Sequence, residues 1–94
     1  MAEADVHTRQ LKVINRLGMH ARAAARFVAV ASGYPCEITV EHGSRRVNGK
    51  SIMGLMMLAA GQGSELRVEA RGEDATEALD ALETLLAERF GEDS

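Results

Sequence analysis

His20 is the residue best suited to chemistry, and it lies in the segment GMHAR (residues 18–22) between a strand pattern and a helix pattern. A neutral imidazole is a nucleophile near physiological pH. The start of a helix offers unpaired N–H groups and the positive end of the helix dipole. A phosphoryl group there would meet the Arg22 guanidinium and the backbone N–H groups of Ala21, Arg22 and Ala23. The segment suits reversible phosphorylation, although a histidine at a helix start is more often an ordinary cap or surface residue.

Ser51 begins a second, shorter helix pattern. Serine at this position is typically an N-cap, whose hydroxyl accepts a hydrogen bond from a helix N–H group. The functional alternative is a phosphorylation site, because the helix dipole favours the added negative charge. The residue types leave both interpretations open.

The apolar residues that follow Ser51 are too many for one face of so short a helix. Some of them should therefore stay exposed, and exposed methionines adapt to several partners. We expect a docking surface that combines them with the His20 segment. Its predicted members are Met19, Arg22, Ile52, Met53, Leu55 and Met56.

Composition excludes several classes of function. The chain has 94 residues, no Trp and only 3% aromatic residues, which argues against base stacking and nucleic-acid binding. The single cysteine, Cys36, permits neither an internal disulfide nor a multi-thiolate metal site. No apolar run approaches the roughly 20 residues of a membrane span. We expect a cytoplasmic protein without metal, cofactor or membrane insertion.

Charge is unevenly distributed along the chain, although the net charge is only −3. Residues 9–50 carry eight basic and two acidic side chains, whereas residues 72–94 carry eight acidic side chains and one arginine. This asymmetry is typical of a basic working face for anions or acidic partners, with a mixed solvated surface as the alternative.

Periodicity predicts the element order βαββαβα. Alternating patterns indicate strands at residues 9–14, 37–41, 45–48 and 65–71, and helical spacing indicates helices at 21–32, 51–58 and 74–90. We expect Asp74 to cap the last helix with Glu77 as its capping-box partner. Strands with one apolar face favour an antiparallel sheet, and all helices must cover that face.

The predicted fold is therefore an α+β open-faced sandwich, with a four-stranded antiparallel sheet and three helices on one face. We expect one domain at residues 9–90, a flexible N-terminal leader at 1–8 and a flexible tail at 91–94.

The sequence resembles the HPr family, the histidine phosphocarriers of the bacterial phosphoenolpyruvate-dependent phosphotransferase system. The resemblance is carried by residues 18–24 (GMHARAA), by Phe27-Val28 and by residues 47–56 (VNGKSIMGLM), at the matching separation. It extends over residues 9–90, nearly the whole chain.

The resemblance implies that His20 takes phosphate from phospho-enzyme I on Nδ1 and passes it to an enzyme IIA-type acceptor. Arg22 matches the family's phosphate-neutralising arginine. Ser51 matches the position that HPr kinase/phosphorylase modifies in some lineages, where phosphoserine antagonises transfer and marks a ligand for a regulatory protein. A protein of this kind is a stoichiometric carrier rather than an enzyme, and a monomer is the simplest state for it.

Two positions depart from the family pattern. Ala23 stands where the family usually has proline, and Leu17 where a small polar residue is common. Alanine restores an N–H group in the first helical turn, which adds a donor for a phosphoryl group. The departures keep open an alternative function, a regulatory effector of carbon or nitrogen control with Ser51 as its switch.

Overall fold

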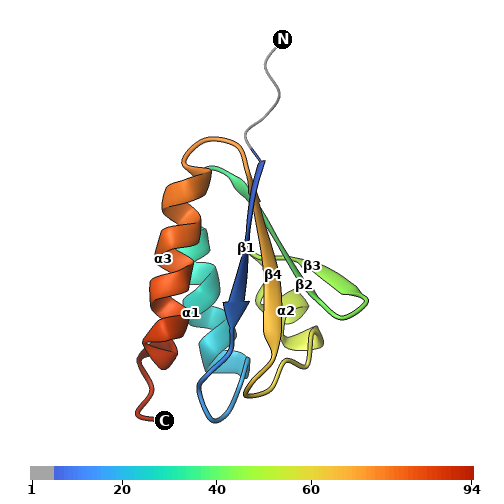
Figure 1. The fold of residues 1–94 in the computed structure, drawn as a ribbon, viewed down its shortest axis with the longest axis vertical. Helices are drawn as coiled ribbons and strands as arrows, with labels where there is room; N and C mark the ends of the chain where they lie inside the picture. Colours follow the sequence, from blue (N-terminus) through green and yellow to red (C-terminus); the bar gives the residue numbers. More distant parts are fainter. Residues whose placement is uncertain (1–5) are drawn as a thin grey trace.

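Four strands and three helices make up most of residues 6–94, the part of the chain that this computed structural model describes (Figure 1). The elements are β1 (Val6–Lys12), α1 (Ala21–Ala31), β2 (Glu37–His42), β3 (Arg45–Asn48), α2 (Ile52–Met57), β4 (Glu65–Arg71) and α3 (Ala75–Ala87). The predicted order βαββαβα is confirmed. A short 3-10 turn, η1 (Arg89–Gly91), follows α3 and was not predicted.

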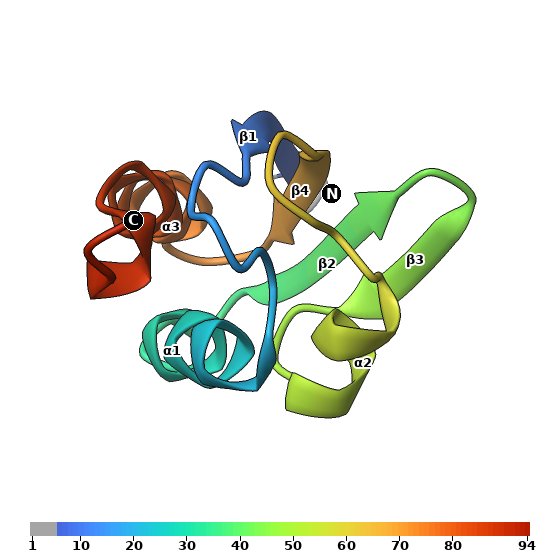
Figure 2. The same ribbon diagram turned by 90° about the horizontal axis from the view of Figure 1, so that it is seen from below.

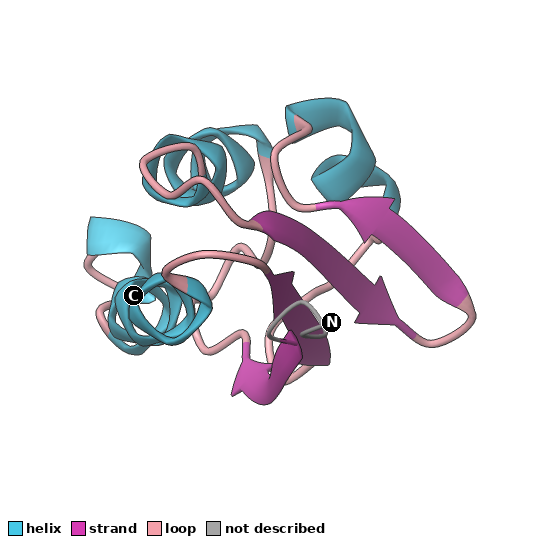
Figure 3. Ribbon diagram, turned by 90° about the horizontal axis from the view of Figure 1, so that it is seen from above, coloured by secondary structure: helices cyan, strands magenta, loops and turns pink. Residues whose placement is uncertain are grey.

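The strands form one antiparallel sheet in the order β1-β4-β2-β3. Leu11 lies opposite Leu66, and Val40 lies opposite Val68, so the apolar residues of neighbouring strands share one face. All three helices cover this face, while the other face is left open (Figures 2 and 3). This arrangement confirms the predicted α+β open-faced sandwich.

The core fills the layer between sheet and helices. Its largest fully buried side chains are Phe27 of α1 and Phe90 of η1, surrounded by leucine and valine from the strands and from α3. The alanines on the inner face of α1, Ala23, Ala24 and Ala31, are also fully buried. Small side chains let α1 lie close to the layer below, which fixes the position of its first turn.

Regular structure extends further toward both ends of the chain than predicted. Strand β1 starts at Val6, so residues 6–8 belong to the sheet and not to a leader; residues 1–5 lie outside the described residues. At the other end, Gly91 belongs to η1 and the side chain of Glu92 is only 11% exposed. The assignment of 91–94 as a flexible tail was therefore wrong for Gly91 and Glu92.

The start of α3 also differs from its prediction. Asp74 occupies the N-cap position, but its backbone lies in the left-handed region (φ 65°) and its side chain makes no capping hydrogen bond. A normal N-cap residue is extended, which directs its side chain toward the helix N–H groups. The predicted capping box of Asp74 and Glu77 is therefore wrong.

Among residues 6–94, every helix is too short or too polar to span a lipid bilayer.

Candidate functional site

His20 is the N-cap residue of α1, as its position in the sequence predicts. Its backbone is extended, and its carbonyl accepts the first helical hydrogen bond from the Ala24 N–H at 2.8 Å. Its side chain does not cap the helix. The N–H groups of Ala21, Arg22 and Ala23 therefore have no acceptor within residues 6–94. They are unpaired donors at the positive end of the helix dipole. Ala21 and Arg22 are exposed, whereas Ala23 is fully buried.

The loop that carries His20 is held by backbone contacts with the segment after α2. The Met19 N–H donates to the Ala60 carbonyl at 2.8 Å. Gly18 has a positive φ of 71°, and a Cβ atom there would lie 2.6 Å from the Ala60 oxygen. Only glycine fits this close approach. The Met19 side chain is buried at 5% exposure, so its assignment to the docking surface was wrong: it anchors the loop in the core.

Glu92, from the far end of the chain, completes the surroundings of His20. One carboxylate oxygen, Oε2, is hydrogen-bonded to Nε2 of His20, and the other, Oε1, accepts from Nδ2 of Asn15 at 2.9 Å. Asn15 is fully buried and also donates to the Gly18 carbonyl at 2.8 Å. The sequence analysis named neither residue as part of the site, and it placed Glu92 in the predicted flexible tail at 91–94.

The electrostatics of the site favour an ionised Glu92. Burial opposes ionisation, but the hydrogen bonds from Asn15 and His20, together with the charge of Arg22, outweigh it and hold the pKa of the Glu92 carboxyl below its ordinary value. Glu92 is therefore an anion at neutral pH.

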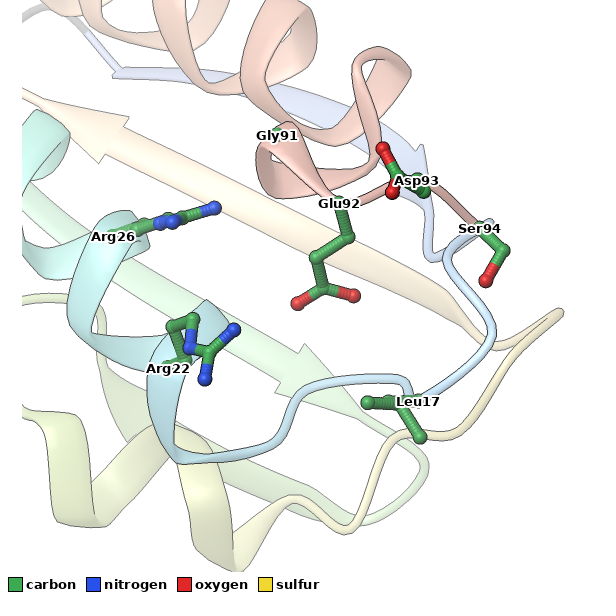
Figure 4. A pocket seen from close by; sticks show the side chains of 7 residues that line it. All are labelled: Leu17, Arg22, Arg26, Gly91, Glu92, Asp93 and Ser94. Atoms are coloured by element: carbon green, nitrogen blue, oxygen red, sulfur yellow. The ribbon is translucent and has the colours of Figure 1, made fainter.

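A shallow pocket opens between the start of α1 and the C-terminal segment. Leu17, Arg22 and Arg26 line one side, and residues 91–94 line the other. Figure 4 shows the Glu92 side chain extending from the C-terminal segment toward Arg22. Arg22 is exposed and makes no hydrogen bond or ion pair within residues 6–94. Its guanidinium is therefore free to pair with an incoming anion.

Ser51 is the N-cap residue of α2. Its backbone is extended, and its hydroxyl oxygen accepts from the Gly54 N–H at 3.0 Å. The predicted capping role is confirmed. Phosphorylation of the same hydroxyl oxygen remains a prediction.

The apolar side chains of α2 divide between core and solvent. Ile52, Met53 and Met56 are 42%, 74% and 45% exposed, in agreement with a surface role. Leu55 is fully buried, so its assignment to the docking surface was wrong. A helix of six residues turns one side inward, and Leu55 lies on that side. Figure 2 shows α1 and α2 side by side, so the exposed side chains of α2 lie on a helix that neighbours the one begun by His20.

No cluster of three metal-binding side chains occurs in residues 6–94.

Comparison with known proteins finds one family of phosphocarriers. The family model described as "PTS HPr component phosphorylation site" matches residues 7–88. The chain is 51% identical over 84 residues to phosphocarrier protein HPr of Pseudomonas aeruginosa, covering 88% of this chain and 93% of that protein. It is 40% identical over 86 residues to phosphocarrier protein NPr of Shewanella violacea, covering 92% of this chain and 94% of that protein.

The fold has a close counterpart among solved structures. The crystal structure of HPr-C-His from Thermoanaerobacter tengcongensis superposes with a TM-score of 0.89 at 41% identity, and covers 94% of this chain and 99% of that chain. The family model, the relatives and the fold agree, and the chain belongs to the HPr family of phosphotransferase-system phosphocarriers.

Proposed function

We propose that His20 is the phosphorylated residue of this phosphocarrier, accepting phosphate from phospho-enzyme I and passing it to an enzyme IIA-type acceptor. The observation that carries this proposal is the uncapped start of α1, where three backbone N–H groups are without acceptors. With the exposed guanidinium of Arg22, they supply a cationic surrounding for phosphoryl oxygens.

The transfer step requires no further reactant. The His20 Nδ1 lone pair forms a bond to phosphorus as the bond between phosphorus and the donor atom of phospho-enzyme I breaks, and the electron pair of that bond stays on the donor atom. In the second transfer the acceptor forms the bond to phosphorus as the phosphorus–Nδ1 bond breaks, and the electron pair of that bond returns to Nδ1 of His20. The protein supplies position and charge stabilisation and acts as a stoichiometric carrier in the cytoplasm.

Docking of enzyme I and the acceptors is proposed to use the exposed side chains of α2, which are Ile52, Met53 and Met56, together with Arg22. Adaptable methionine side chains suit a surface that receives several partners in turn. A shuttle of this kind works as a monomer; one related solved structure is described as an HPr dimer, from Thermoanaerobacter tengcongensis.

A second candidate function is regulation through Ser51, by HPr kinase/phosphorylase and a regulatory protein. Two observations favour it: Ser51 lies at the N-terminus of α2, where a phosphate is electrostatically tolerated, and exposed apolar side chains follow directly. In this role the protein is an effector of carbon or nitrogen control that acts by partner binding.

The test is incubation with phosphoenolpyruvate and enzyme I, followed by mapping of acid-labile phosphate. We expect it on His20 of the wild-type protein and none on the His20→Ala variant, whose circular dichroism should match the wild type. Retained phosphate on the variant would refute the site. Incubation with ATP and HPr kinase tests the second function, which requires an acid-stable phosphate on Ser51.

A further inference from the structure

The contact between Glu92 and His20 has consequences for which ring nitrogen can react. An ionised carboxylate only accepts hydrogen bonds, so the nitrogen that faces it must carry the proton. Oε2 of Glu92 bonds to Nε2 of His20, and Nδ1 makes no hydrogen bond within residues 6–94. The neutral imidazole then carries its proton on Nε2 and its lone pair on Nδ1.

We propose that Glu92 is a positioning residue for phosphoryl transfer, which holds the His20 ring in the Nε2–H tautomer and leaves Nδ1 as the nucleophile. This inference rests on the proposed function of His20. It adds a residue that no local motif contains, from a segment 72 residues further along the chain.

The C-terminal segment is built to hold Glu92 in place. Phe90 is fully buried and lies in the left-handed region (φ 56°), as does Arg89 before it (φ 57°). The Arg26 guanidinium donates to the Phe90 carbonyl oxygen. Non-glycine residues adopt this conformation only where surrounding contacts compensate for the strain. Burial of Phe90 and the hydrogen bonds from Arg26 and Asn15 thus hold the segment in place.

The carboxylate also suits the charge change during transfer. As Nδ1 bonds to phosphorus, the ring gains positive charge and Nε2–H becomes a stronger donor, so the hydrogen bond to Glu92 strengthens along the reaction. The two ring nitrogens direct their bonds toward different edges of the imidazole. Glu92 therefore stabilises the ring without occupying the position of the phosphoryl group.

The first measurement is the tautomer of His20 in the full chain, by long-range ¹H–¹⁵N correlation spectra in buffer alkaline enough to make the ring neutral. We expect the Nε2–H form in the wild type. The Glu92→Gln variant offers one carbonyl oxygen where the carboxylate offered two, and Asn15 competes for it. We therefore expect the share of the Nδ1–H form to rise several-fold.

The matched control is Asp93→Asn, which removes the same charge from the neighbouring residue. Asp93 lines the same pocket but is exposed and makes no hydrogen bond within residues 6–94. The His20 tautomer signals of the Asp93→Asn variant should equal those of the wild type.

The second measurement is the rate of phosphate acceptance from phospho-enzyme I. Carboxylates that orient a histidine in other sites contribute about ten- to hundredfold, and we expect Glu92→Gln to be slower by a factor in that range. Asp93→Asn should stay within about twofold of the wild type. Thermal unfolding of both variants should remain cooperative, which separates positioning from loss of the fold.

The outcomes distinguish the two proposals. A wild-type protein that takes no phosphate would overturn the proposed function together with this role. A competent wild-type protein with the Nδ1–H tautomer would overturn the role of Glu92 alone. So would a Glu92→Gln variant with wild-type spectra, or one that accepts phosphate as fast as or faster than the wild type.

Discussion

At the start of α2 the Ser51 hydroxyl accepts a hydrogen bond from the helix itself, whereas at the start of α1 the side chain of His20 makes no such bond. The Ser51 cap satisfies a donor of its own helix, which typically stabilises a protein by about 1 kcal/mol. The first turn of α1 lacks that stabilisation, and its N–H groups stay unpaired. One helix start thus uses its side chain to stabilise the fold, whereas the other leaves its donors unpaired, as the proposed phosphoryl site requires.

The two starts also differ in where their polar partners come from. Ser51 uses Gly54, three residues away, but His20 uses Glu92, at the opposite end of the sequence. The acidic C-terminal region and the basic N-terminal region therefore meet at the site. Part of the charge asymmetry in the sequence is thus cancelled in space, because Arg9 of β1 likewise pairs with Asp80 and Glu83 of α3.

The largest expected effect concerns Arg22. Replacing Arg22 with Ala removes the exposed guanidinium from the open helix start, and a charge-assisted hydrogen bond of about 1.5–3 kcal/mol corresponds to roughly ten- to hundredfold in rate. We expect phosphate acceptance from phospho-enzyme I to slow by that factor, with unfolding changed by less than about 0.5 kcal/mol. The control is Arg16→Ala, which removes an exposed arginine from the same loop. Equal slowing by both variants would show a general charge effect.

A smaller effect is expected at the start of α2. Ser51→Asp keeps a capping oxygen but adds a negative charge to the proposed docking surface. We expect acceptance at His20 to slow by about tenfold, a change of roughly 1.4 kcal/mol in the activation barrier. Ser51→Asn is the matched control, because asparagine caps a helix without charge. Unchanged kinetics for Ser51→Asp would separate Ser51 from the transfer surface.

The third prediction tests the donor at Ala23. Proline at this position removes one of the three unpaired N–H groups, that of the buried Ala23, while leaving the later helical hydrogen bonds intact. The phosphohistidine of Ala23→Pro should hydrolyse about threefold faster than that of the wild type, corresponding to roughly 0.65 kcal/mol of lost stabilisation. Timed release of phosphate from purified phosphoprotein measures this lifetime. Equal lifetimes would exclude a contribution from the Ala23 N–H.

The smallest effect is a dependence of stability on pH. The pKa of Glu92 is lowered in the folded protein from its ordinary value of 4.5. A lowered folded pKa gives stability that is fully present above the ordinary value and is lost as the pH falls through the folded one. The difference in unfolding free energy between wild type and Glu92→Gln should therefore be at most about 1 kcal/mol at pH 7. In urea titrations this difference should shrink as the pH falls below 4.5. For Asp93→Asn we expect no comparable change; a constant difference for Glu92→Gln would contradict the assignment.

Local sequence patterns predicted much of the fold. Alternation and helical spacing located all four strands and three helices, because each element buries one face and its sequence must follow the geometry of that face. His20 and Ser51 were placed at helix starts for the same reason. The failure at Asp74 was also local: its residue type suits a cap, but its left-handed backbone does not.

The contacts made by side chains were harder to predict. Met19 and Leu55 are hydrophobic residues beside a surface, and only the packed structure shows that they point into the core. Glu92 could not be found from spacing, because its contact with His20 depends on the backbone conformation of Arg89 and Phe90. The only indication in the sequence was the opposite charge of residues 9–50 and residues 72–94, which favours contact between them.

Gly18 and the Met19–Ala60 hydrogen bond join the loop before α1 to the segment after α2. The two loops are backbone neighbours in the free protein, so the surface that they support is ordered before any partner arrives. A partner that covers both helix starts therefore restricts the backbone very little. The conformational entropy lost on association comes mainly from the exposed methionine side chains.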